Sequence, residues 1–208
     1  MLNNVELFCH SSIKLTGSKT IYIDPFALRT ETHDADIIFC THSHYDHFSE
    51  DDIELVKKEK TIIVTPESSR ELAYELVGKD NVLLVEPDKK YEIDGIKFET
   101  TYAYNKEKAY HPKSENWVGY IINFDGMKYY IAGDTDNIKE ITNIECDVAF
   151  IPIGGKYTMD EKEAAQLANT IKAEIIVPTH YGLIVGDKEA GERFKSLVKD
   201  KKVEILIQ

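Results

Sequence analysis

Thr41-His42-Ser43-His44-Tyr45-Asp46-His47 is the most informative segment of this 208-residue sequence. Three imidazoles and one carboxylate lie close together in it, and these ligand types suit zinc and other first-row metal ions. In an extended segment the side chains of His42 and His44 point the same way, so both reach one ion, while a turn redirects Asp46 and His47. Chance rarely produces such a run, which we interpret as a site for one or two metal ions.

The segments on either side place this cluster on a loop. Residues 36–40 form a compact apolar run of strand length that leads directly into the histidines. Ser49 is a good helix N-cap, and the acidic residues 50–52 suit the first turn of a helix, which we expect to run to about Lys58. The cluster therefore lies between a strand and a helix.

The rest of the chain alternates between strands and helices. The spacing of apolar residues, glycines and prolines predicts strands at 5–9, 12–15, 20–24, 61–64, 82–85, 91–93, 96–102, 117–124, 127–131, 148–151, 175–177 and 203–207. It predicts further helices at 66–77, 159–170 and 188–199. Strand-rich parts with helices in both halves favour two facing sheets covered by outer helices, an α/β fold of the four-layer αββα sandwich type, with residues 1–208 as one domain.

Composition limits the classes of function. Apolar residues make up 42% and charged residues 30%, so neither a disordered nor a membrane protein is indicated, and we expect no membrane partner. The net charge of -12 disfavours a nucleic-acid partner. Three widely spaced cysteines, Cys9, Cys40 and Cys146, together with an N-terminus without a leader-like pattern, favour the cytoplasm.

Several motifs resemble those of the metallo-β-lactamase-fold hydrolase superfamily. Residues 42–47 resemble its signature, Gly133-Asp134 after a strand resembles the segment whose aspartate bridges two metals, and Thr179-His180 resembles the late histidine segment. Asp24-Pro25, with His10 before it, resembles the small lactonase-like members, the ascorbate-phosphate-lactonase-like branch. The resemblance spans nearly the whole chain and implies the metallo-β-lactamase fold.

The resemblance also implies a set of metal ligands. By residue number they are His42, His44, Asp46, His47, Asp134 and His180. The first two belong to one metal site with a third group, Asp46, His47 and His180 belong to a second, and Asp134 bridges them. Zinc is the expected ion, in one or two copies, with manganese, iron or nickel as alternatives. His10 and Asp24 are expected behind the ligands or in the pocket wall.

One position departs from the superfamily pattern. The third histidine of the first site should follow the strand that ends near Tyr102, where this chain has Asn105 instead. Either Asn105 stands at the ligand position, or His111 enters from the following loop, and we prefer His111 as a catalytic or ligand group. His33 is expected to be a solvated loop residue.

The expected activity is hydrolysis of an ester, lactone or phosphodiester of a small molecule by a metal-bound hydroxide. Asp46 is a candidate proton acceptor, and His111 or Tyr181 a candidate to stabilise the leaving oxygen. The turn at Gly154-Gly155 before a helix is a candidate anion site. The alternatives are a metal-binding protein of the same fold without catalysis, a di-iron oxidoreductase and a nuclease; the oligomeric state stays open.

Overall fold

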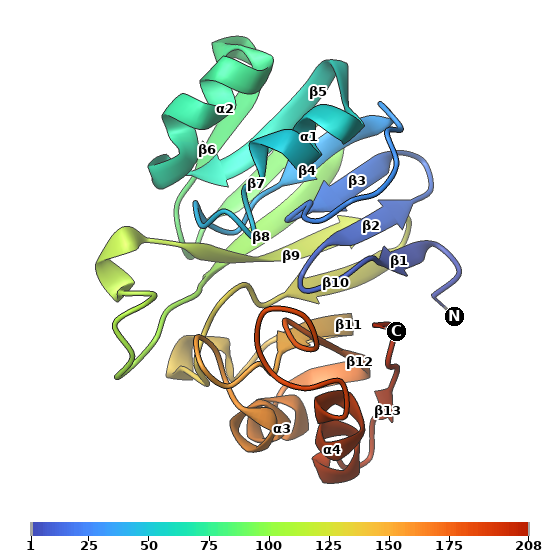
Figure 1. Cartoon of the computed structure of the whole chain (residues 1–208), viewed down its shortest axis with the longest axis vertical. Helices are drawn as coiled ribbons and strands as arrows, with labels where there is room; N and C mark the ends of the chain where they lie inside the picture. The colour runs from blue at the N-terminus through green and yellow to red at the C-terminus, as the bar shows by residue number, and fades with distance from the viewer. Residues whose placement is uncertain (1, 208) are drawn as a thin grey trace. The chain divides into compact units, whose positions relative to one another are not determined.

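The computed structural model of the chain describes residues 2–207, which fall into two compact units, Met1–Glu86 and Pro87–Gln208 (Figure 1). Each unit contains one sheet and its own helices, and each is described in turn. Among the described residues no helix is long and apolar enough to cross a membrane.

The first unit contains a six-stranded mixed sheet in the order β1-β2-β3-β4-β5-β6. The strands are β1 (Val5–Leu7), β2 (Ile13–Thr16), β3 (Thr20–Ile23), β4 (Ala35–Phe39), β5 (Lys57–Pro66) and β6 (Val82–Val85). The first three are antiparallel, and β3 to β6 are parallel. The helices are α1 (Glu50–Val56) and α2 (Arg70–Val77), with short 3₁₀ turns η1 (Glu67–Ser69) and η2 (Lys79–Asn81).

The second unit contains a seven-stranded mixed sheet in the order β13-β12-β11-β10-β9-β8-β7. The strands are β7 (Lys90–Ile93), β8 (Ile96–Tyr102), β9 (Val118–Phe124), β10 (Met127–Ile131), β11 (Glu145–Pro152), β12 (Lys172–Thr179) and β13 (Lys202–Val203). Strands β7 to β10 are antiparallel and β10 to β13 are parallel. The helices are α3 (Glu161–Thr170) and α4 (Ala190–Leu197), with η3 (Lys113–Glu115) and η4 (Lys139–Ile141).

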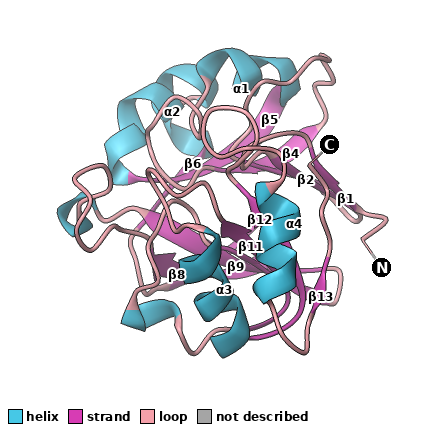
Figure 2. Cartoon of the chain, turned by 60° about the horizontal axis from the view of Figure 1, so that its bottom comes forward, coloured by secondary structure: helices cyan, strands magenta, loops and turns pink. Residues whose placement is uncertain are grey.

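Each sheet packs against its own helices through a separate apolar cluster. In the first unit Ile53 and Val56 of α1 and Ala73 of α2 pack with Ile38 and Ile63 of the sheet. In the second unit helices α3 and α4 lie over β11 and β12 (Figure 2), and small residues of α3 allow a close approach. These clusters hold the ends of the parallel strands in place, and the site residues follow those ends.

Two hairpins of the second sheet turn at Asp-Gly pairs. Strands β7 and β8 are joined at Asp94-Gly95 and β9 and β10 at Asp125-Gly126, and all four of these residues have positive φ. Two successive residues with positive φ make the type I′ turn, which matches the twist of the flanking strands. Asp-Gly is among the residue pairs that favour this turn.

Two predicted elements are shorter than expected. The first helix ends at Val56 and not near Lys58, because Lys57 is extended and pairs with Ala35 at the start of β5. The last strand covers only Lys202–Val203. The backbone N–H of Glu204 donates to the carbonyl oxygen of Ile176. The backbone groups of the residue two positions further along β12 therefore also point toward β13. That residue is a proline, Pro178, which has no N–H to extend the ladder.

Gly119 of β9 lies where strand and loop backbones come close. A Cβ atom there would lie 2.6 Å from Thr101 Oγ1, 2.7 Å from the carbonyl oxygen of Ile131 and 2.8 Å from that of Ala132. We therefore expect Gly119→Ala to lower the free energy of unfolding by about 1–3 kcal/mol in denaturant titrations. The exposed variant Asn123→Ala on the same strand is the control and should change it by less than about 0.5 kcal/mol. Equal effects of the two variants would contradict this prediction.

Candidate metal centre

In the first unit, Asp24 organises the loop that carries the histidines. Its carboxylate accepts hydrogen bonds from the Thr41 backbone N–H at 2.7 Å, the Thr41 hydroxyl at 2.7 Å and His47 Nδ1 at 2.7 Å. Burial raises the pKa of the Asp24 carboxyl, and the neighbouring His47 ring and Thr41 oppose that rise. Because the proton of His47 is held on Nδ1, its Nε2 keeps a lone pair for a metal ion.

His42 is oriented in the same way by a neutral partner. The Thr41 hydroxyl gives its proton to Asp24, so its oxygen accepts from His42 Nδ1 at 3.0 Å. His42 Nε2 then lies 3.0 Å from His44 Nδ1, with the two rings nearly perpendicular at 77°. Two nitrogens on one tetrahedral zinc ion are about 3.3 Å apart, so the spacing suits shared coordination.

A second group of donors in this unit surrounds Asp46. His10 Nε2 lies 3.0 Å from Asp46 Oδ2, and His47 Nε2 lies 3.8 Å from the same oxygen. One donor atom each of His10, Asp46 and His47 therefore falls within 4.8 Å of the others. His10 and Asp24 both have left-handed backbone, with φ of 52° and 46°, which is uncommon for residues other than glycine.

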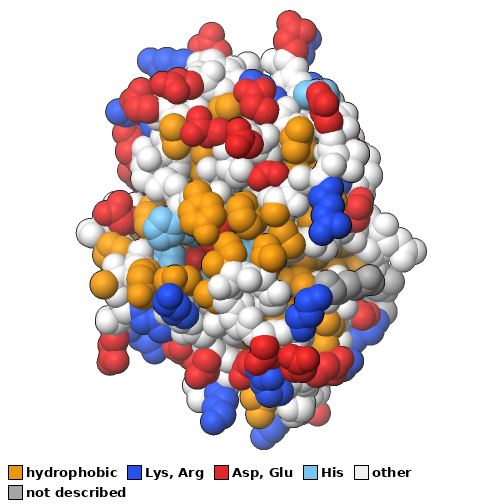
Figure 3. Space-filling model, in the orientation of Figure 1, with side chains coloured by type: hydrophobic (Ala, Val, Ile, Leu, Met, Phe, Trp, Pro, Cys, Tyr) orange, Lys and Arg blue, Asp and Glu red, His pale blue; other side chains and the backbone are white. Residues whose placement is uncertain are grey.

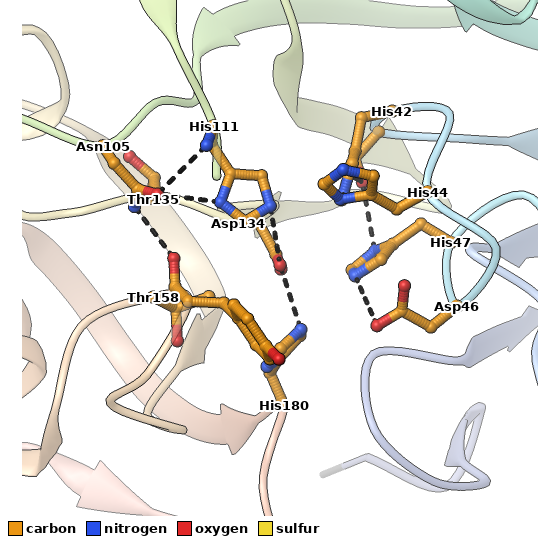
Figure 4. A network of polar contacts seen from close by, with 12 residues as sticks. His42, His44, Asp46, His47, Asn105, His111, Asp134, Thr135, Thr158 and His180 are labelled. Carbon is orange, nitrogen blue, oxygen red and sulfur yellow. Dashed lines mark hydrogen bonds and ion pairs between the residues drawn. The ribbon is translucent and has the colours of Figure 1, made fainter. Parts of the chain in front are cut away.

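In the second unit, Asp134 lies between two histidines (Figure 4). Its Oδ2 atom is 3.2 Å from His111 Nε2 and 3.0 Å from His180 Nε2. Asp134 follows β10 and His180 follows β12, so both come from the carboxyl ends of parallel strands, where sites in α/β folds are commonly built. His180 also has positive φ, 60°, directly after the strand.

Asn105 and His111 act together in this cluster. Asn105 Oδ1 accepts from His111 Nδ1 at 2.9 Å and from the His111 backbone N–H at 3.2 Å. His111 is 1% exposed, and its ring packs edge-on against Trp117. The ring of His111 thus faces Asp134, and Asn105 lies behind it. The expectation that His33 is a solvated loop residue is confirmed, because this side chain is exposed.

Two other candidates are not placed as expected. Tyr181 is buried in the core cluster of the second unit against Gly191, and burial and Glu192 raise its pKa, so its hydroxyl is not placed to stabilise a leaving oxygen. The turn before α3 does not offer an anion site either. Asp160, and not Thr158, caps the helix and accepts from the backbone N–H groups of Lys162 and Glu163.

Two residues that support the site could not be selected from the motifs. Thr41 is the neutral acceptor for His42, and Asp136, two positions after Asp134, accepts from Asn105. The sequence contains only two hints of these roles: Thr41 directly precedes the first histidine, and Asp136 is the second aspartate of the segment 133–136. Neither residue is a metal-ligand type in a recognisable spacing, so the motifs gave no reason to select them.

The chemistry of both clusters fits a first-row metal ion. Their donors are imidazole nitrogens and carboxylate oxygens, which zinc and its neighbours prefer. In His42, His47 and His111 the Nδ1 atom is bonded to a protein group, which leaves Nε2 as the donor, the arrangement typical of metal-binding histidines. The residues present therefore suit such an ion in each unit.

Comparison with known proteins agrees with this chemistry. Residues 4–180 match the family model described as "Beta-lactamase superfamily domain". The chain is 33% identical to a "UPF0173 metal-dependent hydrolase" of Thermococcus onnurineus, over 98% of this chain and 96% of the relative. A crystal structure of a putative metal-dependent hydrolase from Parabacteroides distasonis is also 33% identical, with a TM-score of 0.85 over 98% of this chain and 93% of that one.

A more distant structure agrees in fold. The metallo hydrolase Igni18 from Ignicoccus hospitalis is 24% identical, with a TM-score of 0.76 over 98% of this chain and 94% of that chain. Two mixed sheets, each with its own helices, are the elements that the αββα sandwich requires, so the predicted fold class is confirmed. The chain belongs to the UPF0173 metal-dependent hydrolases, enzymes of the β-lactamase superfamily with the metallo-β-lactamase fold.

Proposed function

We propose that this enzyme hydrolyses an ester, lactone or phosphodiester of a small molecule at a dinuclear metal centre. The residues proposed to hold the metals are His42, His44, Asp46, His47, His111, Asp134 and His180. The observation that carries the proposal is the hydrogen bond that Nδ1 makes to a protein oxygen on three of the rings. His42, His47 and His111 each direct Nδ1 to a protein acceptor, so that Nε2 is available to a cation.

His111 takes the ligand position that the superfamily pattern assigns to a third histidine. Its Nε2 atom and that of His180 both lie close to Asp134 Oδ2, at 3.2 and 3.0 Å, so Asp134 would hold metal together with both histidines. Asn105 supports this ring through Nδ1, so it is proposed as a holder of the ligand and not as a ligand. Zinc is the first candidate ion because N and O donors suit it, with manganese, iron and nickel next.

A divalent ion held by these residues would lower the pKa of a bound water to about 7 and would polarise the substrate oxygen. The residues of the chain then move and hold protons. Asp46 is proposed to accept the proton of the attacking water through its carboxylate, which is 13% exposed. His10, 3.0 Å from Asp46 Oδ2, holds that carboxylate in place and is a route for the proton to leave.

Surface charge supports a small molecule as the substrate. On the face drawn in Figure 3, lysine and arginine side chains are separated from one another by acidic and neutral ones. A nucleic acid would need a continuous positive surface, and the net charge of the chain is -12. Free cysteines at positions 9, 40 and 146 suit a reducing compartment, so we propose that the enzyme works in the cytoplasm.

The test is metal content together with hydrolysis. The purified chain, reconstituted with zinc at neutral pH, should bind two ions by elemental analysis and hydrolyse at least one of a generic ester, a lactone and a bis-aryl phosphodiester. Hydrolysis should stop when a chelator removes the metal. Bound metal without turnover of any of the three would favour a non-catalytic metal-binding protein.

His111→Ala tests the third ligand. We expect it to lower the zinc content by about one ion per chain, because one metal loses a nitrogen donor, and to reduce hydrolysis on the order of 100-fold. His33→Ala is the matched control, since His33 is exposed and should leave both values unchanged. Unaltered zinc content in His111→Ala would remove His111 from the ligand set.

A further inference from the structure

The strongest unexplained group outside the proposed ligands is the buried carboxylate of Asp136. It is 3% exposed and accepts three hydrogen bonds: from Asn105 Nδ2 at 3.0 Å, the Lys106 backbone N–H at 2.8 Å and Lys108 Nζ at 2.5 Å. We infer that Asp136 is a positioning residue that acts through Asn105 to hold His111 in the tautomer able to bind metal. This inference rests on the proposed role of His111 as a ligand.

The first step is the orientation of the Asn105 amide. Asn105 Nδ2 faces Asp136 Oδ1 at 3.0 Å and the carbonyl oxygen of Tyr157 at 2.9 Å. A carboxylate and a carbonyl are both acceptors, so only the NH₂ end of the amide can face them. The orientation is thus fixed by chemistry, and Oδ1 must face the other way.

The oxygen of the Asn105 amide in turn sets the tautomer of the His111 ring. Asn105 Oδ1 already accepts from the His111 backbone N–H, which has no other role than donor. The same oxygen lies 2.9 Å from His111 Nδ1, so this ring nitrogen must carry a proton. In the neutral ring Nε2 then directs its lone pair toward Asp134 Oδ2, 3.2 Å away, and two acceptors facing each other would together hold a cation.

Further contacts hold Asp136 in place behind Asn105. Lys108 Nζ neutralises the carboxylate and also donates to the carbonyl oxygen of Thr158 at 2.8 Å. The backbone N–H of Asp136 bonds to the carbonyl oxygen of Tyr104, which ties down the loop that leads to His111. A buried carboxylate that accepts from three donors is held firmly and serves as a fixed acceptor for Asn105.

The decisive variant is Asp136→Asn. The new amide offers one acceptor oxygen in place of two and can turn an N–H toward Asn105. The Tyr157 carbonyl oxygen then holds Asn105 Nδ2 alone, so the Asn105 amide turns its NH₂ toward His111 more readily. We expect a population of His111 with the proton on Nε2, visible in ¹⁵N NMR of the metal-free chain, and zinc affinity about 10–100-fold lower in chelator competition. Glu140→Gln is the control, because Glu140 bonds Tyr104 and Lys113 in the same unit but not Asn105 or His111.

A swap of the two residues separates positioning from a general loss of packing. In the double variant Asn105→Asp with Asp136→Asn, a carboxylate at position 105 replaces the amide oxygen that accepts from His111 Nδ1. The amide N–H that joins the two side chains then comes from position 136. This variant should recover the Nδ1-protonated ring and part of the zinc affinity. Wild-type tautomer and affinity in a folded Asp136→Asn chain, or no recovery in a folded double variant, would overturn the inference. If the wild type binds no zinc, the proposed function fails. The tautomer of His111 in the metal-free chain still shows whether Asp136 positions that ring.

Discussion

Replacing Asp134 by asparagine is expected to remove bound metal and to reduce hydrolysis on the order of 10³-fold, the equivalent of about 4 kcal/mol. Asp134 Oδ2 is the atom on which His111 Nε2 and His180 Nε2 converge, at 3.2 and 3.0 Å. An amide of the same size keeps the packing but removes the negative charge that attracts two cations. Elemental analysis and hydrolysis assays of the reconstituted variant measure both effects.

The control for this variant is Asp147→Asn. Asp147 accepts from the Lys128 backbone N–H at 2.6 Å in the same unit, so it tests the loss of a carboxylate away from the cluster. It should keep its metal content. The unfolding temperature of chelator-treated Asp134→Asn should not fall below that of chelator-treated wild type, because a buried charge has been removed. Full zinc content in Asp134→Asn would show that Asp134 is not a ligand.

Replacing Asp24 by alanine is expected to lower the free energy of unfolding by about 3–5 kcal/mol, even without metal. Asp24 is 0% exposed and accepts from Thr41 twice and from His47 Nδ1, each at 2.7 Å. Its loss leaves buried donors without an acceptor in this loop, and such groups cost the full desolvation penalty. Denaturant titration of the chelator-treated chain measures the change.

Asp36→Ala is the matched comparison for Asp24→Ala. Asp36 also accepts from a backbone N–H, that of Thr20, and pairs with Lys58, but both charged side chains are partly in solvent. Its loss should cost about 1 kcal/mol or less. Asp24→Ala should also lower zinc affinity, since the proton on His47 Nδ1 is no longer fixed. Similar destabilisation by the two variants would mean that the Asp24 contacts contribute little.

Most of the fold could be predicted from the sequence because caps, turns and apolar spacing indicate the same elements. Ser49 caps α1 with acidic residues behind it, and Asp94-Gly95 makes a hairpin turn, so these elements follow from local chemistry. The boundaries that failed depend on partners distant in sequence. Lys57 leaves the helix to pair with Ala35, and β13 stops where Pro178 of its neighbour offers no donor.

The candidate site also contains residues that the sequence could predict and one that it could not. Side chains two to five positions apart, such as those of His42, His44 and His47, could be selected from spacing alone. The choice between Asn105 and His111 could not, because it depends on the path of the loop between them. That path is fixed by Asp136, which is distant in sequence and resembles any other acid until its three donors are seen.

The left-handed backbone at His10 and His180 has a consequence for engineering the enzyme. For a residue other than glycine this conformation costs about 1–3 kcal/mol, so a glycine at either position would adopt it with less strain. Selection for resistance to heat alone would therefore favour replacement of these two histidines, and it would improve stability at the expense of activity. A thermostable design should keep both residues and change positions away from the site.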